Sequence, residues 1–179
     1  SSTMLREEQQ KVVRVGVVGC GSIARRFVPE SSYVNGIEIA GAYDIDDVTT
    51  RYFVSVYDLP RAYFSYEEML KDVDAVYVAT PHLSHYTLSK QAILAKKHVL
   101  CEIPLVLEAK QAKELYELAE KQGVILMEAH KTAHCPAFNH LMVMIKSGAI
   151  GEVVDIEASL SRLLPNKNRR EFDVNQAGG

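Results

Sequence analysis

Short apolar runs recur along the chain, and segments with helical periodicity separate them. Runs of this kind predict strands at 12–18, 37–43, 62–64, 75–79, 98–101 and 124–127. The intervening segments predict helices at about 22–30, 47–57, 84–96 and 108–122, with another helix after residue 65. Strands that alternate with helices in this way form an open parallel sheet with right-handed crossovers. The predicted fold class is therefore α/β, with a doubly wound parallel sheet.

Residues that start and stop helices support several of these elements. Ser65 and Glu68 form a capping-box signature at the start of one helix. Ser84 is placed to cap the helix after the fourth strand, and Gly123 to close the helix before the sixth strand. Within the helix at 47–57, three apolar residues recur at every fourth position: Val48, Tyr52 and Val56. These residues therefore support helices that the apolar periodicity already predicts.

The first strand ends in a glycine turn, Gly19-x-Gly21-x-x-Ala24, with the spacing of the dinucleotide-binding fingerprint of the Rossmann fold. Gly19 permits the tight turn, Gly21 leaves room for a pyrophosphate, and Ala24 keeps the first helical turn close to the sheet. The start of that helix offers free backbone N–H groups and a positive dipole end to a phosphate. The residues of this turn that we expect to bind the cofactor are Gly19, Gly21, Ser22 and Ile23.

Asp44 follows the second strand and lies 23 residues after Gly21. This separation is close to the roughly 20 residues at which an acidic side chain bonds the adenosine ribose hydroxyls. A carboxylate there would repel a 2′-phosphate, so Asp44 favours NAD over NADP, although NADP stays possible. Two alternatives remain open: the turn serves packing alone, or the domain binds another nucleotide-bearing ligand such as S-adenosylmethionine.

The composition narrows the class of protein and its partners. Of the 179 residues, 47% are hydrophobic and 24% are charged, which is typical of a soluble globular protein. The net charge of −3 and the lack of any basic run beyond 166–170 predict no nucleic-acid partner. No apolar run approaches the roughly 20 residues of a membrane span. The first ten residues lack the apolar core of a signal peptide, so we expect no membrane partner either.

Cysteine and histidine usage gives no sign of disulfides or of a metal site. The three cysteines, Cys20, Cys101 and Cys135, form no C-x-x-C pair and leave an odd count, which fits a reducing, cytoplasmic location. His130 and His134 have the spacing of two ligands on one helical face, with Cys135 next to them. A strand before them and a proline after them make helical geometry doubtful, so we predict no metal.

The pattern changes after residue 128. Residues 136–147 predict a helix, and 152–161 alternate apolar and polar positions as a strand with one solvated face does in an antiparallel sheet. The predicted organisation is a polar N-terminal arm (1–11), a dinucleotide-binding domain (12–128) and the start of an α+β second domain (129–179). About 50 residues are too few for a stable core of their own, and the glycine-rich end suggests a truncated second domain.

Four stretches of the chain, in order, resemble the Gfo/Idh/MocA family, named in part for glucose–fructose oxidoreductase and inositol 2-dehydrogenase. They are Gly19-Cys20-Gly21-Ser22-Ile23-Ala24, Ala79-Thr80-Pro81-His82-x-x-His85, Cys101-Glu102-Ile103-Pro104-Leu105, and Met127-Glu128-Ala129 followed by Pro136. Gly148-x-Ile150-Gly151-Glu152-Val153 is similar to the start of the family's second domain. The resemblance covers nearly the whole chain after residue 11.

The resemblance implies a two-domain NAD(P)-dependent oxidoreductase. Such enzymes pass a hydride between the nicotinamide and a carbinol carbon of a sugar, an inositol or a related polyol or diol. The resemblance also implies a homo-oligomer when the full second domain is present. It places Thr80, Pro81 and His82 along the cofactor, His85 near the ribose end, and Glu102 near the nicotinamide ribose.

Two departures from the family pattern concern proton transfer. The family motif Glu-Lys-Pro has a lysine where this chain has Ile103, and isoleucine cannot donate a proton or stabilise an alkoxide. Lys131 is our candidate catalytic replacement; the alternative is an ordinary cleft or solvated lysine. The family's later segment with an aspartate and a histidine has no counterpart before Gly179. An alternative function is therefore a catalytically impaired NAD(H)-binding homologue that acts as a sensor or interaction subunit.

Overall fold

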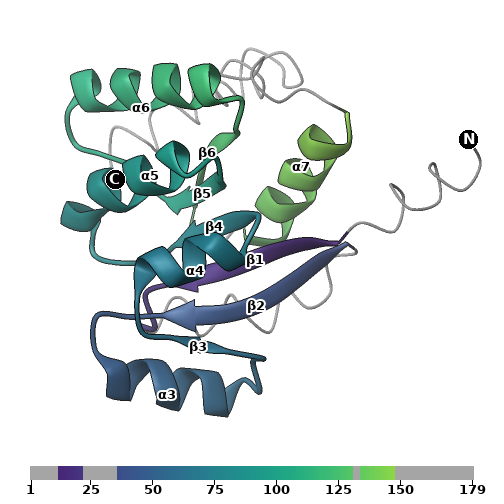
Figure 1. Cartoon of the computed structure of the whole chain (residues 1–179). Helices are drawn as coiled ribbons and strands as arrows, with labels where there is room; N and C mark the ends of the chain where they lie inside the picture. The colour runs from purple at the N-terminus through teal and green to yellow at the C-terminus, as the bar shows by residue number, and fades with distance from the viewer. Residues whose placement is uncertain (1–11, 22–35, 131–133, 148–179) are drawn as a thin grey trace, which may run out of the picture.

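A computed structural model describes residues 12–21, 36–130 and 134–147, without the side chains of 134–136. In these residues a six-stranded parallel sheet carries helices on its faces (Figure 1). The strands are β1 (Val13–Val18), β2 (Ile37–Tyr43), β3 (Ala62–Tyr63), β4 (Ala75–Val78), β5 (His98–Glu102) and β6 (Leu126–Ala129). Their order is β3-β2-β1-β4-β5-β6, so the direction of winding reverses between β1 and β4. Doubly wound folds bind ligands at the carboxyl edge of such a switch point.

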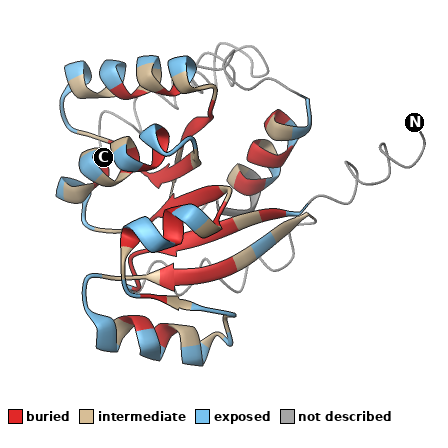
Figure 2. Ribbon diagram, viewed as in Figure 1, coloured by how far each residue is buried: buried red, intermediate tan, exposed pale blue. Residues whose placement is uncertain are grey.

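Two apolar cores cover the two faces of the sheet, and the strands between them are largely buried (Figure 2). All four residues of β4 are buried: Ala75 and Tyr77 belong to one core, and Val76 and Val78 to the other. Successive side chains of a strand point to opposite faces of the sheet. A strand that is covered on both faces therefore has apolar residues at every position of its sequence. The predicted parallel α/β sheet is confirmed.

The helices are distributed over the two cores. They are α3 (Asp47–Val56), α4 (Tyr66–Asp72), the 3₁₀ turn η1 (His82–Ser84), α5 (His85–Leu94), α6 (Ala109–Gln122) and α7 (His134–Lys146). Buried residues of α4, α5 and α6 pack in one core, and those of α3 and α7 pack in the other. None of the helices in the described part of the chain combines the length and apolarity needed to cross a bilayer.

Two of the three predicted helix caps are confirmed. The Ser65 hydroxyl accepts a hydrogen bond from the Glu68 N–H at 3.3 Å, and Gly123 ends α6 in the left-handed region with φ of 71°. The third prediction is wrong, because Ser84 makes no capping bond to α5. Its hydroxyl lies 2.8 Å from the Pro81 carbonyl oxygen instead. The chain enters α5 through η1, so Ser84 already has helical dihedral angles and its side chain points back along the turn.

The apolar repeat of α3 lies on the exposed side of that helix. Val48, Tyr52 and Val56 are 72%, 58% and 52% exposed, whereas Thr50 and Phe53 are buried. Burial of a threonine is possible here because its hydroxyl lies 3.0 Å from the backbone nitrogen of Asp44 and 3.1 Å from the carbonyl oxygen of Asp46. The helix is present where the sequence predicts it, with a polar residue on its buried side.

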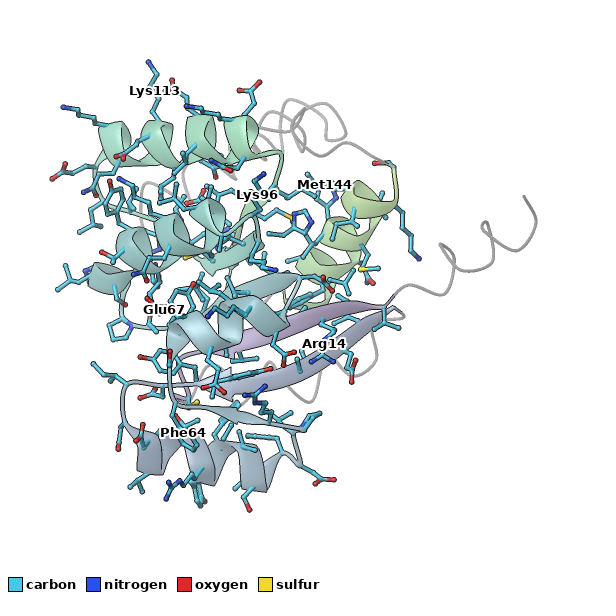
Figure 3. All side chains as sticks on the ribbon, in the orientation of Figure 1. Arg14, Phe64, Glu67, Lys96, Lys113 and Met144 are labelled. Carbon is cyan, nitrogen blue, oxygen red and sulfur yellow. The ribbon has the colours of Figure 1, made fainter. Side chains whose placement is uncertain are left out.

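Helix α7 packs on the sheet, although it follows the domain boundary predicted at residue 128. Phe138 is fully buried and its ring lies 6.0 Å from that of Tyr77 in β4. Met142 reaches Gly36, where an added Cβ would meet its terminal carbon at 3.0 Å. Met144, labelled in Figure 3, belongs to the same core. The predicted arm at 1–11, helix at 22–30 and strand at 152–161 lie outside the described residues.

Candidate cofactor site

Gly19 brings the turn after β1 against the ends of two neighbouring strands. Its N–H donates to the carbonyl oxygen of Tyr43 at 2.8 Å, and its φ is 97°. An added Cβ would lie 2.9 Å from the carbonyl carbon and oxygen of Ala79 and 3.0 Å from Cγ2 of Thr80. A side chain is therefore excluded both by the backbone conformation and by a backbone neighbour that cannot move aside.

Gly21 lies in a different environment from Gly19. It is exposed, and among the described residues no atom outside its chain neighbours lies within 4 Å of the position that a Cβ would take. No described atom at the carboxyl edge of β1 therefore blocks the close approach of a pyrophosphate to Gly21. The residues of the turn fit a dinucleotide on this observation. Ser22 and Ile23, predicted to continue the phosphate site, lie outside the described residues.

Asp44 is fixed between the glycine turn and the start of α3. Its Oδ2 accepts a hydrogen bond from the backbone N–H of Cys20 at 3.0 Å, and its Oδ1 accepts one from the N–H of Asp46, also at 3.0 Å. A carboxylate offers about four acceptor positions, so these two bonds leave capacity for further donors. The carboxylate is only partly buried. The Asp44 side chain is therefore held in a fixed orientation at the carboxyl edge of the sheet, and its bond to the ribose hydroxyls stays a prediction.

The loop after β4 contains three residues that the sequence predicts to lie along the cofactor, and the first of them, Thr80, lies beside the glycine turn. Thr80 lies against Gly19, and its Oγ1 is 2.7 Å from the Ser84 hydroxyl. Pro81 and His82 follow it and are exposed. Their side chains are thus accessible to a ligand at the carboxyl edge of the sheet.

His85 lies beneath this loop and not along its surface. It is 2% exposed, with Nδ1 at 2.7 Å from the carbonyl oxygen of Pro104 and Nε2 at 2.8 Å from that of Thr80. Both ring nitrogens are therefore occupied by main-chain acceptors. No ring nitrogen is therefore left to contact a ligand, and the position of His85 near the ribose end of the cofactor stays a prediction.

The ends of β5 and β6 are joined by main-chain and side-chain bonds. Glu102 is 3% exposed and lies beside Ala129 in the strand register. The N–H of the half-buried Ile103 donates to the carbonyl oxygen of Ala129 at 3.1 Å. Glu128 accepts from the N–H of Leu105 at 3.2 Å. Sequence reasoning missed this role of Glu128; the signal was an acidic residue at the end of a buried strand.

Both cysteines that the structure describes, Cys20 and Cys101, are buried. Burial raises the pKa of the Cys101 thiol, so the thiolate is not available for nucleophilic chemistry. Across 12–21, 36–130 and 134–147, no three His, Cys, Asp or Glu residues are grouped to hold a metal ion. Lys131 and the side chains of His134 and Cys135 are not among the described residues.

The chain matches a family model over residues 13–130: that of the GFO_IDH_MocA oxidoreductase family, with an NAD-binding Rossmann fold. The match spans more than half of the sequence, so the chain belongs to this family. The family resemblance and the Rossmann sheet predicted from the sequence are both confirmed.

Similar proteins include several dehydrogenases. Trans-1,2-dihydrobenzene-1,2-diol dehydrogenase of Mus musculus is 34% identical over 173 residues, which are 93% of this chain and 51% of that protein. The chain thus spans about half the length of the curated relatives it matches. Among solved structures, UDP-N-acetylglucosamine 3-dehydrogenase from Acidithiobacillus ferrooxidans is 27% identical with a TM-score of 0.63, covering 73% of this chain and 42% of that one.

Two further solved structures hold a nicotinamide cofactor. A 3-ketoreductase from Actinomadura kijaniata in complex with TDP-benzene and NADP is 31% identical, with a TM-score of 0.64 over 76% of this chain and 44% of that one. GenD2 from gentamicin A biosynthesis, in complex with NAD, is 28% identical with a TM-score of 0.63 over 66% of this chain and 34% of that one. The relatives therefore use either form of the cofactor.

Proposed function

We propose that the chain is the cofactor-binding part of an NAD-dependent oxidoreductase that acts on a sugar, an inositol or a related polyol or diol. The observation that carries this proposal is the Asp44 carboxylate, held against the glycine turn beside the open space at Gly21. Family membership and the cofactors in the related structures support it. The bound cofactor supplies the site that accepts or donates a hydride.

The preference for NAD over NADP rests on Asp44. A 2′-phosphate on the adenosine ribose would approach the acidic side chain of Asp44, and repulsion between two negatively charged groups disfavours its binding. The related structures hold NAD in one case and NADP in another, so family membership alone does not select between them. The side chain at position 44 is what favours NAD.

The other site residues bind and orient the two ends of the cofactor. The N–H groups of the turn after Cys20 bind the pyrophosphate, while Thr80, Pro81 and His82 line its path. Glu102 lies at the end of β5, on the side expected to hold the nicotinamide ribose. Ile103 occupies the position of the family's lysine, and its backbone N–H is bonded to Ala129. Lys131 follows Ala129 by two residues in the sequence. Lys131 is the proposed replacement for that lysine as the group that handles the substrate proton.

The names of the relatives support the proposed substrate class, and the homo-oligomer is proposed from the family resemblance. Their names include a dihydrodiol dehydrogenase, a UDP-sugar dehydrogenase and a 3-ketoreductase, all consistent with oxidation or reduction at a carbinol carbon. The whole protein would act on such a small molecule in the cytoplasm, as a homo-oligomer built through its second domain. No nucleic acid or membrane takes part in this function.

A second candidate is a catalytically impaired NAD(H)-binding homologue. It is favoured by Ile103, because a half-buried aliphatic side chain occupies the position of the family's lysine. Binding of the cofactor is shared by both candidates, and turnover separates them. Activity toward polyols that is lost in a Lys131→Met variant would support the enzyme; unchanged binding without any turnover would support the impaired homologue.

A titration of NADH fluorescence, repeated with NADPH, tests the cofactor site. The chain has no tryptophan, so the nicotinamide emission is free of energy transfer from that residue. We expect saturable binding of NADH and much weaker binding of NADPH. If neither nucleotide binds, this chain does not bind the cofactor and the proposal is wrong for it.

A further inference from the structure

A side chain of β6 holds the loop that follows β5. The two strands are parallel neighbours in the sheet (Figure 1). Their pairing reaches the loop at residues 103–105 through the Ile103 N–H, which donates to the carbonyl oxygen of Ala129 at 3.1 Å. Two residues later, the Leu105 N–H donates to Oε1 of Glu128 at 3.2 Å. The 103–105 loop is therefore joined to β6 by a main-chain bond and by a side-chain bond.

Glu128 reaches this loop along one face of the sheet. Leu126, two positions earlier in β6, belongs to the core that α4, α5 and α6 cover. Alternate side chains of a strand point to the same face, so Glu128 points to that core as well. Leu105 packs in the same core. The partly buried carboxyl group thus lies between the end of β6 and the loop.

The chemistry of the two groups fixes the direction of this bond. A backbone N–H can only donate, and a carboxyl group can accept whether or not it is ionised. Leu105 is 0% exposed, so bulk water does not reach its N–H. A buried donor that loses its partner is costly, and the loop would have to shift to find another acceptor. The acceptor oxygen of Glu128 therefore helps to keep the loop in place.

We propose that Glu128 is a positioning residue that holds the 103–105 loop against β6 and thereby sets the nicotinamide half of the cofactor site. This inference rests on the proposed function, in which Glu102 lies at the nicotinamide ribose. Glu102 directly precedes the loop, and Ile103, at the position of the family's lysine, is the first residue of the loop. A shift of the loop would change the place of both side chains. Asp44 follows β2 and is not held by this bond.

The test compares Glu128→Met and Glu128→Gln with the unaltered chain. Methionine has a similar length and no oxygen, whereas glutamine keeps an acceptor oxygen. We expect Glu128→Met to bind NADH about tenfold more weakly, as for the loss of one net hydrogen bond. AMP lacks the second phosphate, the nicotinamide and its ribose, so its affinity should stay within about twofold in a chemical-shift titration. Glu128→Gln should bind both nucleotides as the unaltered chain does.

Asp74→Leu is the matched control. Asp74 is partly buried like Glu128, and its Oδ2 also accepts from a backbone N–H, that of Arg14 at 2.9 Å. It directly precedes β4 and so lies at the opposite edge of the parallel sheet. We expect this variant to be less stable but to bind NADH and AMP as the unaltered chain does. Weakening of NADH binding in Asp74→Leu to the extent seen in Glu128→Met would overturn the inference.

The nucleotide affinities of the two Glu128 variants can contradict the positioning role in other ways. Equal weakening of NADH and AMP in Glu128→Met would indicate a general loss of structure. Unchanged NADH affinity in Glu128→Met would show that the bond does not affect the nicotinamide half. Binding of NADH that is as weak in Glu128→Gln as in Glu128→Met would show that an acceptor oxygen is not what holds the loop.

Amide hydrogen exchange tests the bond without the cofactor. The Leu105 N–H should exchange about tenfold faster in Glu128→Met than in the unaltered chain, and at the unaltered rate in Glu128→Gln. An unprotected Leu105 amide in the unaltered chain would overturn the inference even if Glu128→Met failed to fold. If the unaltered chain binds no NADH, the proposed function fails, and the Leu105 exchange rates still decide whether Glu128 holds the loop.

Discussion

The Asp44 carboxylate accepts a hydrogen bond from the Cys20 backbone N–H at 3.0 Å, and this bond joins the end of β2 to the glycine turn after β1. The side chain assigned to the ribose is thereby part of the turn assigned to the pyrophosphate. The two subsites are built as one unit, so a change at Asp44 affects both.

Removal of the Asp44 side chain should weaken cofactor binding. We expect Asp44→Ala to bind NADH about tenfold to a hundredfold more weakly, because a charged acceptor is lost. Asp44→Asn keeps one side-chain oxygen and removes the charge, so it should chiefly relax the discrimination against NADPH. Fluorescence titration with both nucleotides measures each effect.

The control for these variants is Asp47→Ala, which removes an exposed carboxylate from the first turn of α3. It should leave both affinities unchanged. NADH affinity that is the same in Asp44→Ala and in the unaltered chain would show that the ribose is not bound by this carboxylate.

Alanine substitutions at Gly19 and Gly21 should have different effects on the stability of the fold and on the binding of NADH. Gly19→Ala combines a positive φ with a backbone contact at 2.9 Å, so it should lower the free energy of unfolding by about 2 kcal/mol or more. Gly21→Ala meets no described neighbour and should stay within about 0.5 kcal/mol. Urea unfolding measures both.

NADH titration of the Gly21→Ala variant completes this comparison. Its Cβ would occupy the space that the pyrophosphate needs, so binding should weaken although the fold is intact. A stable Gly21→Ala variant with unaltered NADH affinity would argue against a pyrophosphate at this turn.

The stability of the chain should depend on pH through His98. Its Nδ1 accepts a hydrogen bond from the Ile125 N–H at 3.0 Å, and burial lowers its pKa below the ordinary 6.5. At pH values under 6.5 the unfolded chain binds the proton more readily than the folded chain does. The free energy of unfolding therefore falls as the pH is lowered through about 6.5, and this contribution levels off below the native pKa.

A His98→Gln variant isolates that contribution, since its amide oxygen can accept from Ile125 without titrating. Urea unfolding at pH 7.5 and at pH 5.5 should show a smaller difference between the two conditions for the variant than for the unaltered chain. Identical differences would mean that His98 does not contribute to this pH dependence.

A buried tyrosine lowers the pKa of the Asp72 carboxyl. The Tyr63 hydroxyl donates to Asp72, and this bond is the main cause that lowers the pKa of the carboxyl, with Arg14 adding to it (Arg14 is labelled in Figure 3). Burial and the same bond raise the pKa of Tyr63 to about 12. We expect Tyr63→Phe to lower the free energy of unfolding by about 1 kcal/mol at pH 7.

The stability of the Tyr63→Phe variant should depend less on acid pH than that of the unaltered chain. A carboxyl with a lowered native pKa stabilises the fold above its ordinary value of 3.8, and that stability is lost as the pH falls through the native pKa. Tyr63→Phe should therefore lose less stability below about pH 4 than the unaltered chain does. Tyr86→Phe, whose hydroxyl bonds the exposed Glu114, is the control and should change little. A pKa of Asp72 that NMR titration finds unaltered in Tyr63→Phe would contradict this account.

The sequence predicted the sheet, two of the caps and the glycine turn, because each depends on local residue pattern. The four-residue repeat at Val48, Tyr52 and Val56 predicted α3 but not its buried side, which is decided by the hydrogen bonds of Thr50. The motif around His85 predicted a place near the cofactor but not the burial of this side chain. Its partner Pro104 is distant in sequence and is brought near only by the pairing of β4 with β5.

Helix α7 closes a face of the sheet that begins with the first strand. It is the last described element, yet it packs against Tyr77 in β4 and reaches Gly36 at the start of β2. During synthesis, the part of that face under α7 remains uncovered until residues near 144 have emerged from the ribosome, although α3 packs on the same face earlier. Until then, apolar side chains of the early strands are exposed and prone to aggregation. We expect the domain to complete its fold only after α7 has been made.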